Sequence, residues 1–404
     1  MQNVSELTNC LCCNGSSLKL ILDLNEQPLA NSFRKSTEGE ELVFPLKLNF
    51  CKDCSHLQLS HAVNPDLLFK NYLYVSGTTK TLKEYFDWFA KYSLTFFKKA
   101  PNTVLDIACN DGTQLDSWKS LGLTTYGIDP AKNLHSISSS NHEVVCDYFT
   151  EKYIEYYKSK NLDIINAQNV FAHIKYPLKF LQQCKAIMKD NTVLFIQTSQ
   201  SEMIKNNEFD TIYHEHLSFF NTNSMNTLAK RAGLYLTDVI KTDIHGTSYV
   251  FVFKLKDTIG NLNKVLNSEK DFGLQDYNTY VKYAEKCYKT VNDLKKLIQN
   301  YQAKNYTVCG YGAAAKGMTL INFAKLNLDF IIDDNPLKQG LFTPGRNIPI
   351  VPIDYLSSID TSNIIFIPLA WNFFKEIKNR IKAKRNEKNN DLFIKYFPEI
   401  SIET

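Results

Sequence analysis

Four neighbouring side chains between Phe209 and Phe220 can hold or move protons: Tyr213, His214, Glu215 and His216. A hydrophobic core has little use for such groups, because burying them is costly. Proton chemistry does use them: a histidine can act as base, a carboxylate can orient it and a phenol can steady developing negative charge. The alternative is a polar loop whose side chains are solvated or bonded to the backbone. We interpret the cluster as catalytic, since proton-handling groups concentrate at functional sites.

The size and composition of the chain limit its class. A chain of 404 residues predicts two or three domains, and 44% hydrophobic with 22% charged residues is typical of a soluble globular protein. The net charge of +4 comes without a large basic block, so no nucleic-acid partner is indicated. The N-terminus lacks the pattern of a signal peptide, and no apolar run is long enough to span a bilayer. We therefore expect a cytoplasmic protein without a membrane partner, in an oligomeric state that the sequence leaves open.

Two Cys-x-x-Cys pairs near the N-terminus predict a metal site. They are Cys10 with Cys13 and Cys51 with Cys54, and residues 14–50 lie between them. Two such turns can close a tetrahedral Zn²⁺ site, and four thiolates leave no open position for catalysis, so the role is structural. The alternative is two incidental pairs of reduced thiols. Cys12 is a further candidate ligand.

The elements that must position these residues follow an α/β pattern. Short apolar strands alternate with helical stretches from Val104 to Gln197, which predicts a doubly wound parallel sheet, and the segments 234–240 and 248–255 add its last strands. Residues 262–304 are expected to be helical and to connect to a second α/β unit that begins at Tyr306. We predict an α/β protein with domains at 1–75, 76–260 and 261–404.

The first α/β unit has the features of a nucleoside site. Its acidic and amide side chains follow strand ends, where the carboxyl edge of a sheet binds ligands: Asp106, Asn110, Asp111, Gly112, Asp129, Gln168 and Asn169. Asp129 ends the second strand, where an acidic residue bonds ribose hydroxyls. Because the loop lacks Gly-x-Gly-x-x-Gly, a dinucleotide fits poorly, and a nucleoside without phosphate such as S-adenosylmethionine (SAM) fits better. Gln168 and Asn169 would hold its methionine end, with His173 near the methyl group or simply bonded to the backbone.

The second α/β unit carries the loop from Gly310 to Gly317, which includes Lys316. A Rossmann unit presents helix N-terminal N–H groups at this place, and we expect the loop to face an interdomain cleft and to help hold the nucleotide part of a substrate. The alternative is that its small residues only allow close packing, with Lys316 solvated.

Taken in order, these motifs resemble one family along essentially the whole chain. They are the two cysteine pairs, Pro28–Asn31, Tyr72–Thr79, Asn110–Thr113, Asn169–Ile174, Thr211–His216, His245–Gly246, Gly310–Gly317 and Asp334–Gly340. The set is similar to the SAM-dependent C-methyltransferases that act on nucleotide-linked 4-keto-deoxysugars. The resemblance implies an N-terminal zinc domain, a central SAM domain and a C-terminal Rossmann-like domain.

The resemblance also implies roles for matching positions. His216 would be the general base, with Glu215 and Tyr213 beside it and His173 near the methyl group. Tyr74 would add a hydroxyl from the N-terminal region, with Tyr72 as the rival for that match. Substrate contacts would come from Asn31, Tyr72, His245 and Lys316. One departure is Ala108, where the family usually has glycine; we expect the backbone to accept alanine if φ is negative at this position.

The implied chemistry explains the residue types. A sugar carbon becomes a nucleophile by losing a proton next to a ketone, so a 4-keto group prepares C3 for a base such as His216, and Tyr74 or Tyr213 would stabilise the enolate oxygen. The product would be a branched deoxysugar for a surface glycan or a secondary metabolite. Three alternatives stay open: sugar O-methylation, NAD-dependent oxidoreduction through Gly310-x-Gly312, and a non-catalytic zinc scaffold.

Overall fold

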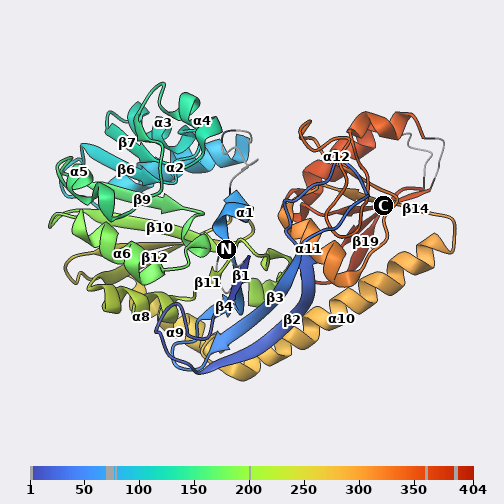
Figure 1. Cartoon of the computed structure of the whole chain (residues 1–404), viewed down its shortest axis with the longest axis horizontal. Helices are drawn as coiled ribbons and strands as arrows, with labels where there is room; N and C mark the ends of the chain where they lie inside the picture. Colours follow the sequence, from blue (N-terminus) through green and yellow to red (C-terminus); the bar gives the residue numbers. More distant parts are fainter. Residues whose placement is uncertain (1–2, 70–76, 78–79, 200–201, 360–362, 386–389) are drawn as a thin grey trace.

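The computed structural model describes residues 3–69, 77, 80–199, 202–359, 363–385 and 390–404. Two α/β sheets lie on either side of a long β-hairpin from the N-terminal region (Figure 1). Tyr72 and Tyr74 fall outside the described residues.

The central sheet has seven strands in the order β12-β13-β10-β9-β6-β7-β8. They are β6 (Thr103–Ile107), β7 (Thr124–Ile128), β8 (Glu143–Val145), β9 (Ile164–Gln168), β10 (Val193–Ser199), β12 (Tyr235–Thr242) and β13 (Ser248–Lys254). The prediction of a parallel sheet is confirmed for β6 to β10, whereas β13 pairs antiparallel with both β10 and β12. The carboxyl ends of β6 to β10 therefore meet at one edge, where a ligand site is expected.

Helices cover both faces of this sheet. They are α2 (Lys80–Leu94), α3 (Thr113–Ser120), α4 (Lys132–Ser138), α5 (Ile154–Lys158), α6 (Pro177–Ala186) and α8 (Thr222–Ala232), with 3-10 turns η2 (Glu151–Tyr153) and η3 (Phe171–His173). Helix α7 (Met203–Asn206) and the 3-10 turn η4 (Phe209–Thr211) pack instead in the core shared by the N- and C-terminal regions. Helix α2 buries Leu82, Phe86 and Phe89 on one stripe, and the Phe89 ring meets Trp118 and Phe195 edge-on. This packing fixes α2 and α3 above the sheet edge.

The N-terminal region forms two small sheets. Its elements are β1 (Val4–Glu6), β2 (Leu18–Pro28), β3 (Val43–Cys51), β4 (Leu57–Leu59), β5 (His61–Val63) and α1 (Pro65–Phe69). β1 pairs with β5, and β2, β3 and β4 form a sheet whose fourth strand is β11 (Ser218–Phe219). A strand that directly follows the Tyr213–His216 cluster thus completes the N-terminal sheet.

The C-terminal region begins with the predicted helices, α9 (Leu262–Phe272) and α10 (Tyr277–Gln302). Its sheet has the order β16-β15-β14-β17-β18-β19 and is parallel except for β19. The elements are β14 (Thr307–Tyr311), α11 (Ala315–Ala324), β15 (Phe330–Ile332), β16 (Ile350–Val351), η5 (Ile353–Ser357), β17 (Ile364–Pro368), η6 (Trp371–Phe373), α12 (Phe374–Lys384), β18 (Leu392–Lys395) and β19 (Ser401–Glu403). Among the described residues, every helix is too short or too polar to cross a membrane.

Candidate active site and metal centre

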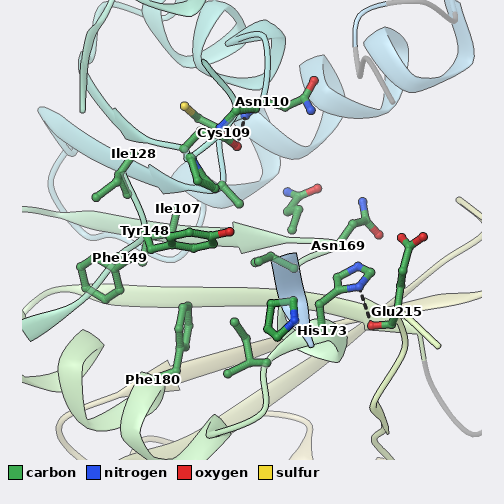
Figure 2. A pocket seen from close by; sticks show the side chains of 18 of the residues that line it. Ile107, Cys109, Asn110, Ile128, Tyr148, Phe149, Asn169, His173, Phe180 and Glu215 are labelled. Carbon is green, nitrogen blue, oxygen red and sulfur yellow. Dashed lines mark hydrogen bonds between the residues drawn. The ribbon is translucent and has the colours of Figure 1, made fainter. Parts of the chain in front are cut away.

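A cavity of about 340 Å³ lies at the carboxyl edge of the central sheet. Its lining unites many of the residues that the sequence singled out, namely Asp106, Asn110, Asp129, Gln168, Asn169, His173 and Glu215. Figure 2 shows His173 and Glu215 at one end of this cavity and the loop of Cys109 and Asn110 across from them. Two of the predicted cofactor-binding residues are not part of the lining: Asp111 accepts a 2.8 Å hydrogen bond from the Gly77 N–H, and Gly112 is the N-cap of α3.

The loop between β6 and α3 has an unusual backbone. Ala108, Asn110 and Gly112 have φ values of 64°, 52° and 85°, all in the left-handed region. Ala108 therefore does not meet the condition of a negative φ under which we expected the backbone to accept it. An alanine in this region costs roughly 1–2 kcal/mol, and the strain is held in place by the Ala108 N–H, which donates to the Ile128 carbonyl at 2.8 Å.

Asp129 ties this loop to the end of β7. Its Oδ2 accepts from the Asn110 N–H at 2.9 Å and its Oδ1 from the Ala131 N–H at 2.7 Å. Burial raises the pKa of Asp129, and these two hydrogen bonds oppose that shift. Each carboxylate oxygen has a second lone pair, so both can still accept a hydroxyl from a ribose in the cavity.

Asp106 is held in the same way by a neighbour that the sequence analysis missed. The Asn166 side-chain amide donates to Asp106 Oδ1 at 2.6 Å. Burial raises the pKa of Asp106 to about 7, against the effect of this hydrogen bond. Asn166 lies two positions before Gln168 on β9, where alternation along a strand puts it on the same face.

Aromatic residues form another part of the lining that sequence reasoning did not find. Tyr148 and Phe149 follow β8, and Phe180 of α6 lies below them (Figure 2). The sequence offered one indication of Tyr148 and Phe149, because both lie shortly after the third strand of the sheet, β8. The lining thus combines carboxylates and amides, which can hydrogen-bond a ribose and an amino acid, with aromatic rings that can contact an adenine. This combination of side chains fits SAM.

The four residues of the cluster face different surroundings. His214 is buried against the N-terminal sheet, with its Nε2 3.2 Å from the Phe44 carbonyl oxygen, and burial lowers its pKa to about 4. Glu215 reaches the cavity. Solvation is excluded for His214, Glu215 and His216, which are all less than a tenth exposed. The other half of that alternative, bonding to the backbone, holds for one ring nitrogen each of His214 and His216.

His216 is fixed in one tautomer. Its Nδ1 lies 2.9 Å from the Thr211 carbonyl oxygen, which only accepts, so Nδ1 carries the proton. The Nε2 atom then accepts from the Tyr213 hydroxyl at 2.9 Å. Burial lowers the pKa of His216 well below its ordinary value, so the ring is neutral near pH 7. A neutral imidazole with a defined acceptor atom has the properties of a general base.

His173 connects this pair to the cavity. Its ring centroid lies 5.1 Å from that of His216, and its Nδ1 donates to the Glu215 carbonyl at 2.7 Å (Figure 2). Burial raises the pKa of the Glu215 carboxyl to about 7, while the Asn31 side-chain amide, 2.6 Å from Oε1, opposes this shift. The carboxyl group therefore titrates near physiological pH.

The predicted substrate residues His245 and Lys316 meet between the two α/β sheets. Lys316 Nζ donates to the His245 carbonyl at 3.1 Å and lies 4.9 Å from the Trp371 ring centroid. His245 Nε2 is 3.4 Å from the Asn169 amide nitrogen. Lys316 thus contacts the central domain while its side chain stays partly exposed.

Packing accounts for the glycines before and after Lys316. A Cβ on Gly317 would lie 2.7 Å from the Leu369 Cβ, and one on Gly310 would lie 3.0 Å from Leu369 Cδ1. These glycines let α11 and β14 approach β17 closely.

The four predicted metal ligands converge. The sulfur atoms of Cys10, Cys13, Cys51 and Cys54 all lie within 4.8 Å of one another, with 3.7 Å from Cys10 to Cys54 and 3.5 Å from Cys13 to Cys51. Tetrahedral Zn²⁺ with Zn–S bonds of about 2.3 Å separates its sulfurs by roughly 3.8 Å, so the residues fit zinc. Cys12 is not part of this group, because its Sγ donates to the Ser224 carbonyl at 2.8 Å.

The region that carries this metal centre is joined by strand pairing to the segment that follows the Tyr213–His216 cluster. In the strand pairing, Gln58 faces Ser218 and Leu57 faces Phe219, and the Leu59 N–H donates to the Leu217 carbonyl at 2.9 Å. The same loop is held from the other side, where the Leu217 N–H donates to the Ala172 carbonyl at 2.8 Å. The zinc-bearing region therefore helps to place His216.

Three domain families match consecutive parts of the chain. Residues 10–69 match the family described as "Putative zinc binding domain" and residues 79–239 match "Methyltransferase domain". Residues 243–398 match "C-methyltransferase C-terminal domain".

One relative aligns with nearly the whole chain. The C-methyltransferase NovU of Streptomyces niveus is 27% identical over 411 residues, which cover 98% of this chain and 97% of that protein. The ubiquinone biosynthesis O-methyltransferase of Glaesserella parasuis serovar 5 is 31% identical over 106 residues, which cover 24% of this chain and 44% of that protein.

Solved structures match parts of the chain. The plantazolicin methyltransferase BamL, in complex with a triazolic desmethylPZN analog and SAH, is 16% identical and covers 44% of this chain and 87% of its own, with a TM-score of 0.36. The PH0226 protein from Pyrococcus horikoshii OT3 is 13% identical and covers 47% of this chain and 99% of its own, with a TM-score of 0.36.

Proposed function

Because the chain belongs to the SAM-dependent C-methyltransferases that combine a zinc-binding domain, a methyltransferase domain and a C-methyltransferase C-terminal domain, we propose that it methylates C3 of a nucleotide-linked 4-keto-deoxysugar. The observation that carries this proposal is a proton-handling group formed by Glu215 and His173, which line one end of the cavity, and by His216, whose ring lies beside that of His173. Methyl transfer to carbon next to a ketone needs removal of a C–H proton, and Glu215, His173 and His216 together can hold and move one.

In this proposal the cavity residues hold SAM. Asp129 accepts hydrogen bonds from the ribose hydroxyls, and Tyr148 and Phe149 cover the adenine ring. Gln168 and Asn169 bind the methionine end. SAM supplies an electrophilic methyl group on its sulfonium sulfur. The zinc supplies no chemistry to the reaction, since four cysteine ligands leave it closed, and its site holds the N-terminal fold.

His216 is the proposed base. Its Nε2 takes the C3 proton, and the electron pair of the C–H bond passes to the keto oxygen to form an enolate. Because Nε2 has a single lone pair, the Tyr213 hydroxyl that donates to it in the structure turns away when the substrate binds and donates to the keto oxygen, where it stabilises the enolate. The electron pair then returns from the enolate oxygen as the ketone re-forms, and C3 bonds to the methyl carbon. The bond between that carbon and the SAM sulfur would break with its electron pair left on sulfur, which would give S-adenosylhomocysteine as the leaving group. The proton stays on the imidazole until it is released to water.

The nucleotide part of the substrate is proposed to bind between the two α/β sheets, near His245 and Lys316. A lysine at the start of α11 can pair with a diphosphate. We place the reaction in the cytoplasm, where the six cysteines outside the zinc site stay reduced.

Hydrogen exchange at C3 tests the proposal. Purified protein is incubated in D₂O with nucleotide-linked 4-keto-deoxysugars, with and without SAM, and the sugar is followed by NMR. Deuterium at C3 and a C3 methyl group in the presence of SAM are expected. Transfer to oxygen without exchange would replace the proposal with sugar O-methylation.

A further inference from the structure

A turn from the N-terminal region reaches the catalytic cavity. Residues Leu29 to Ser32 follow β2, and the Ser32 N–H closes the turn on the Leu29 carbonyl at 3.0 Å. At its tip, the Asn31 side-chain amide donates to Glu215 Oε1 at 2.6 Å. This short hydrogen bond joins residues from two domains, and one of them lines the cavity.

The turn is anchored on its far side to the C-terminal domain. The Arg34 N–H donates to the Phe342 carbonyl at 2.9 Å, and the Phe342 N–H donates to the Arg34 carbonyl at 2.8 Å. The Arg34 guanidinium also donates to Asn347 Oδ1 at 3.1 Å, and Lys338 Nζ lies 5.1 Å from the Phe33 ring centroid. Asn31 is therefore presented to Glu215 from a segment held by backbone pairing.

An amide N–H can only donate, so it bonds the ionised carboxylate better than the protonated acid. Glu215 is 7% exposed, and burial favours its protonated form. Three sets of titratable groups surround Glu215. The His173 Nδ1 donates to the Glu215 carbonyl oxygen, and Tyr213, His214 and His216 are its neighbours in the chain. The cavity lining adds Asp106, Asp129, Asp147, Tyr148 and Lys175. Among the described contacts, Asn31 donates a hydrogen bond to the Glu215 carboxyl oxygen itself, and none of these other groups does.

We propose that Asn31 is a positioning residue of the reaction, which acts from the N-terminal domain by aiming the Glu215 carboxyl group and favouring its ionised form. The resemblance implied a direct substrate contact for Asn31, and this role is different because it acts through Glu215. The inference rests on the proposed function in one respect, the participation of the Glu215 carboxylate in proton transfer.

The first test measures Glu215 without any substrate. Glutamate labelled with ¹³C at the carboxyl group is titrated by NMR in the SAM-free protein, and Glu215→Gln identifies the signal. Asn31→Leu removes the donor at similar volume, and its loss should raise the Glu215 midpoint by about one pH unit. Asn31→Asp, isosteric but without the N–H donors, should raise it as well, and Ser32→Ala in the same turn should leave it unchanged. Equal midpoints in the wild type and both Asn31 variants would overturn the proposal.

The second test follows methyl transfer against pH. Asn31→Leu should move the acidic limb of kcat upward by the same amount and recover most of its rate above that limb, with little change in KM for the sugar. A raised KM with an unshifted limb would instead identify Asn31 as a substrate contact and overturn the positioning role. If no keto-sugar is methylated, the proposed function fails, while the titration still decides the role of Asn31. Thermal unfolding identifies a variant that does not fold, and Asn31→Asp then serves in its place.

Discussion

The hydroxyl oxygen of Tyr213 lies 2.9 Å from Nε2 of His216, while Nδ1 of the same ring lies 2.9 Å from the Thr211 carbonyl oxygen. One imidazole is thus held between a group that fixes its proton and a group that can move one. This arrangement makes Nε2 the acceptor of the substrate proton in the proposed reaction.

Replacing His216 with asparagine should lower kcat for methyl transfer by about 10²–10⁴-fold, because the general base is lost. SAM affinity should change little, since His216 is not part of the cavity lining. Isothermal titration of SAM and single-turnover kinetics measure the two effects. His214→Asn is the matched control, because His214 bonds a backbone carbonyl away from the cavity; a kcat that falls equally in both variants would argue for a structural role.

Glu215→Gln should raise the free energy of unfolding relative to the wild type, and this difference should grow as the pH rises. The Glu215 pKa is about 7 in the folded protein and 4.5 for the ordinary group, so the folded state holds its proton more tightly. The stability that this group contributes is full below pH 4.5 and is lost as the pH rises through 7. Glutamine does not titrate, so the variant should gain up to about 3 kcal/mol over the wild type at pH 8 relative to pH 4. Urea unfolding at the two pH values measures this, and a pH-independent difference would contradict it.

Ala108→Gly should stabilise the protein by up to about 1 kcal/mol, because glycine adopts the φ of 64° without strain. Thermal and urea unfolding report the change. Ala186→Gly, at the end of helix α6, should be neutral or destabilising by contrast. A destabilised Ala108→Gly variant would mean that the alanine methyl group contributes more by packing than its backbone strain costs.

Metal analysis should find about one Zn²⁺ per chain. Cys51→Ser should lose the zinc and unfold at lower temperature, since a structural zinc site contributes directly to folding. Cys12→Ser should keep it, because Cys12 bonds the Ser224 carbonyl instead. Retention of zinc by Cys51→Ser together with its loss in Cys12→Ser would reverse the ligand assignment.

Asp129→Ala should weaken SAM binding by roughly 10–100-fold, through loss of hydrogen bonds to a charged acceptor. Calorimetric titration measures the affinity, and Asp111→Ala, which lies outside the lining, is the comparison. Unaltered SAM affinity in Asp129→Ala would show that the ribose contact lies elsewhere.

Local patterns predicted much of this molecule. The Cys-x-x-Cys spacing identified all four metal ligands, and strand ends such as Asp106 and Asp129 identified the edge of the sheet that holds the cavity. These features depend on residues close together in the chain, so their pattern is readable.

Other features depend on contacts between distant segments, which leave no local pattern. The two-residue strand at Ser218 and Phe219 pairs with β4 across the chain, and Asn31 meets Glu215 from another domain. The left-handed backbone at Ala108 also went against the ordinary preference of alanine, because the surrounding loop overrides it.

The most direct measurement of the central claim is deuterium incorporation at C3 of a nucleotide-linked 4-keto-deoxysugar by the wild type and by His216→Asn, in D₂O with and without SAM. The account predicts exchange and C3 methylation by the wild type, and loss of both in the variant while SAM still binds. Methyl transfer to oxygen, or undiminished C3 exchange in His216→Asn, would contradict it.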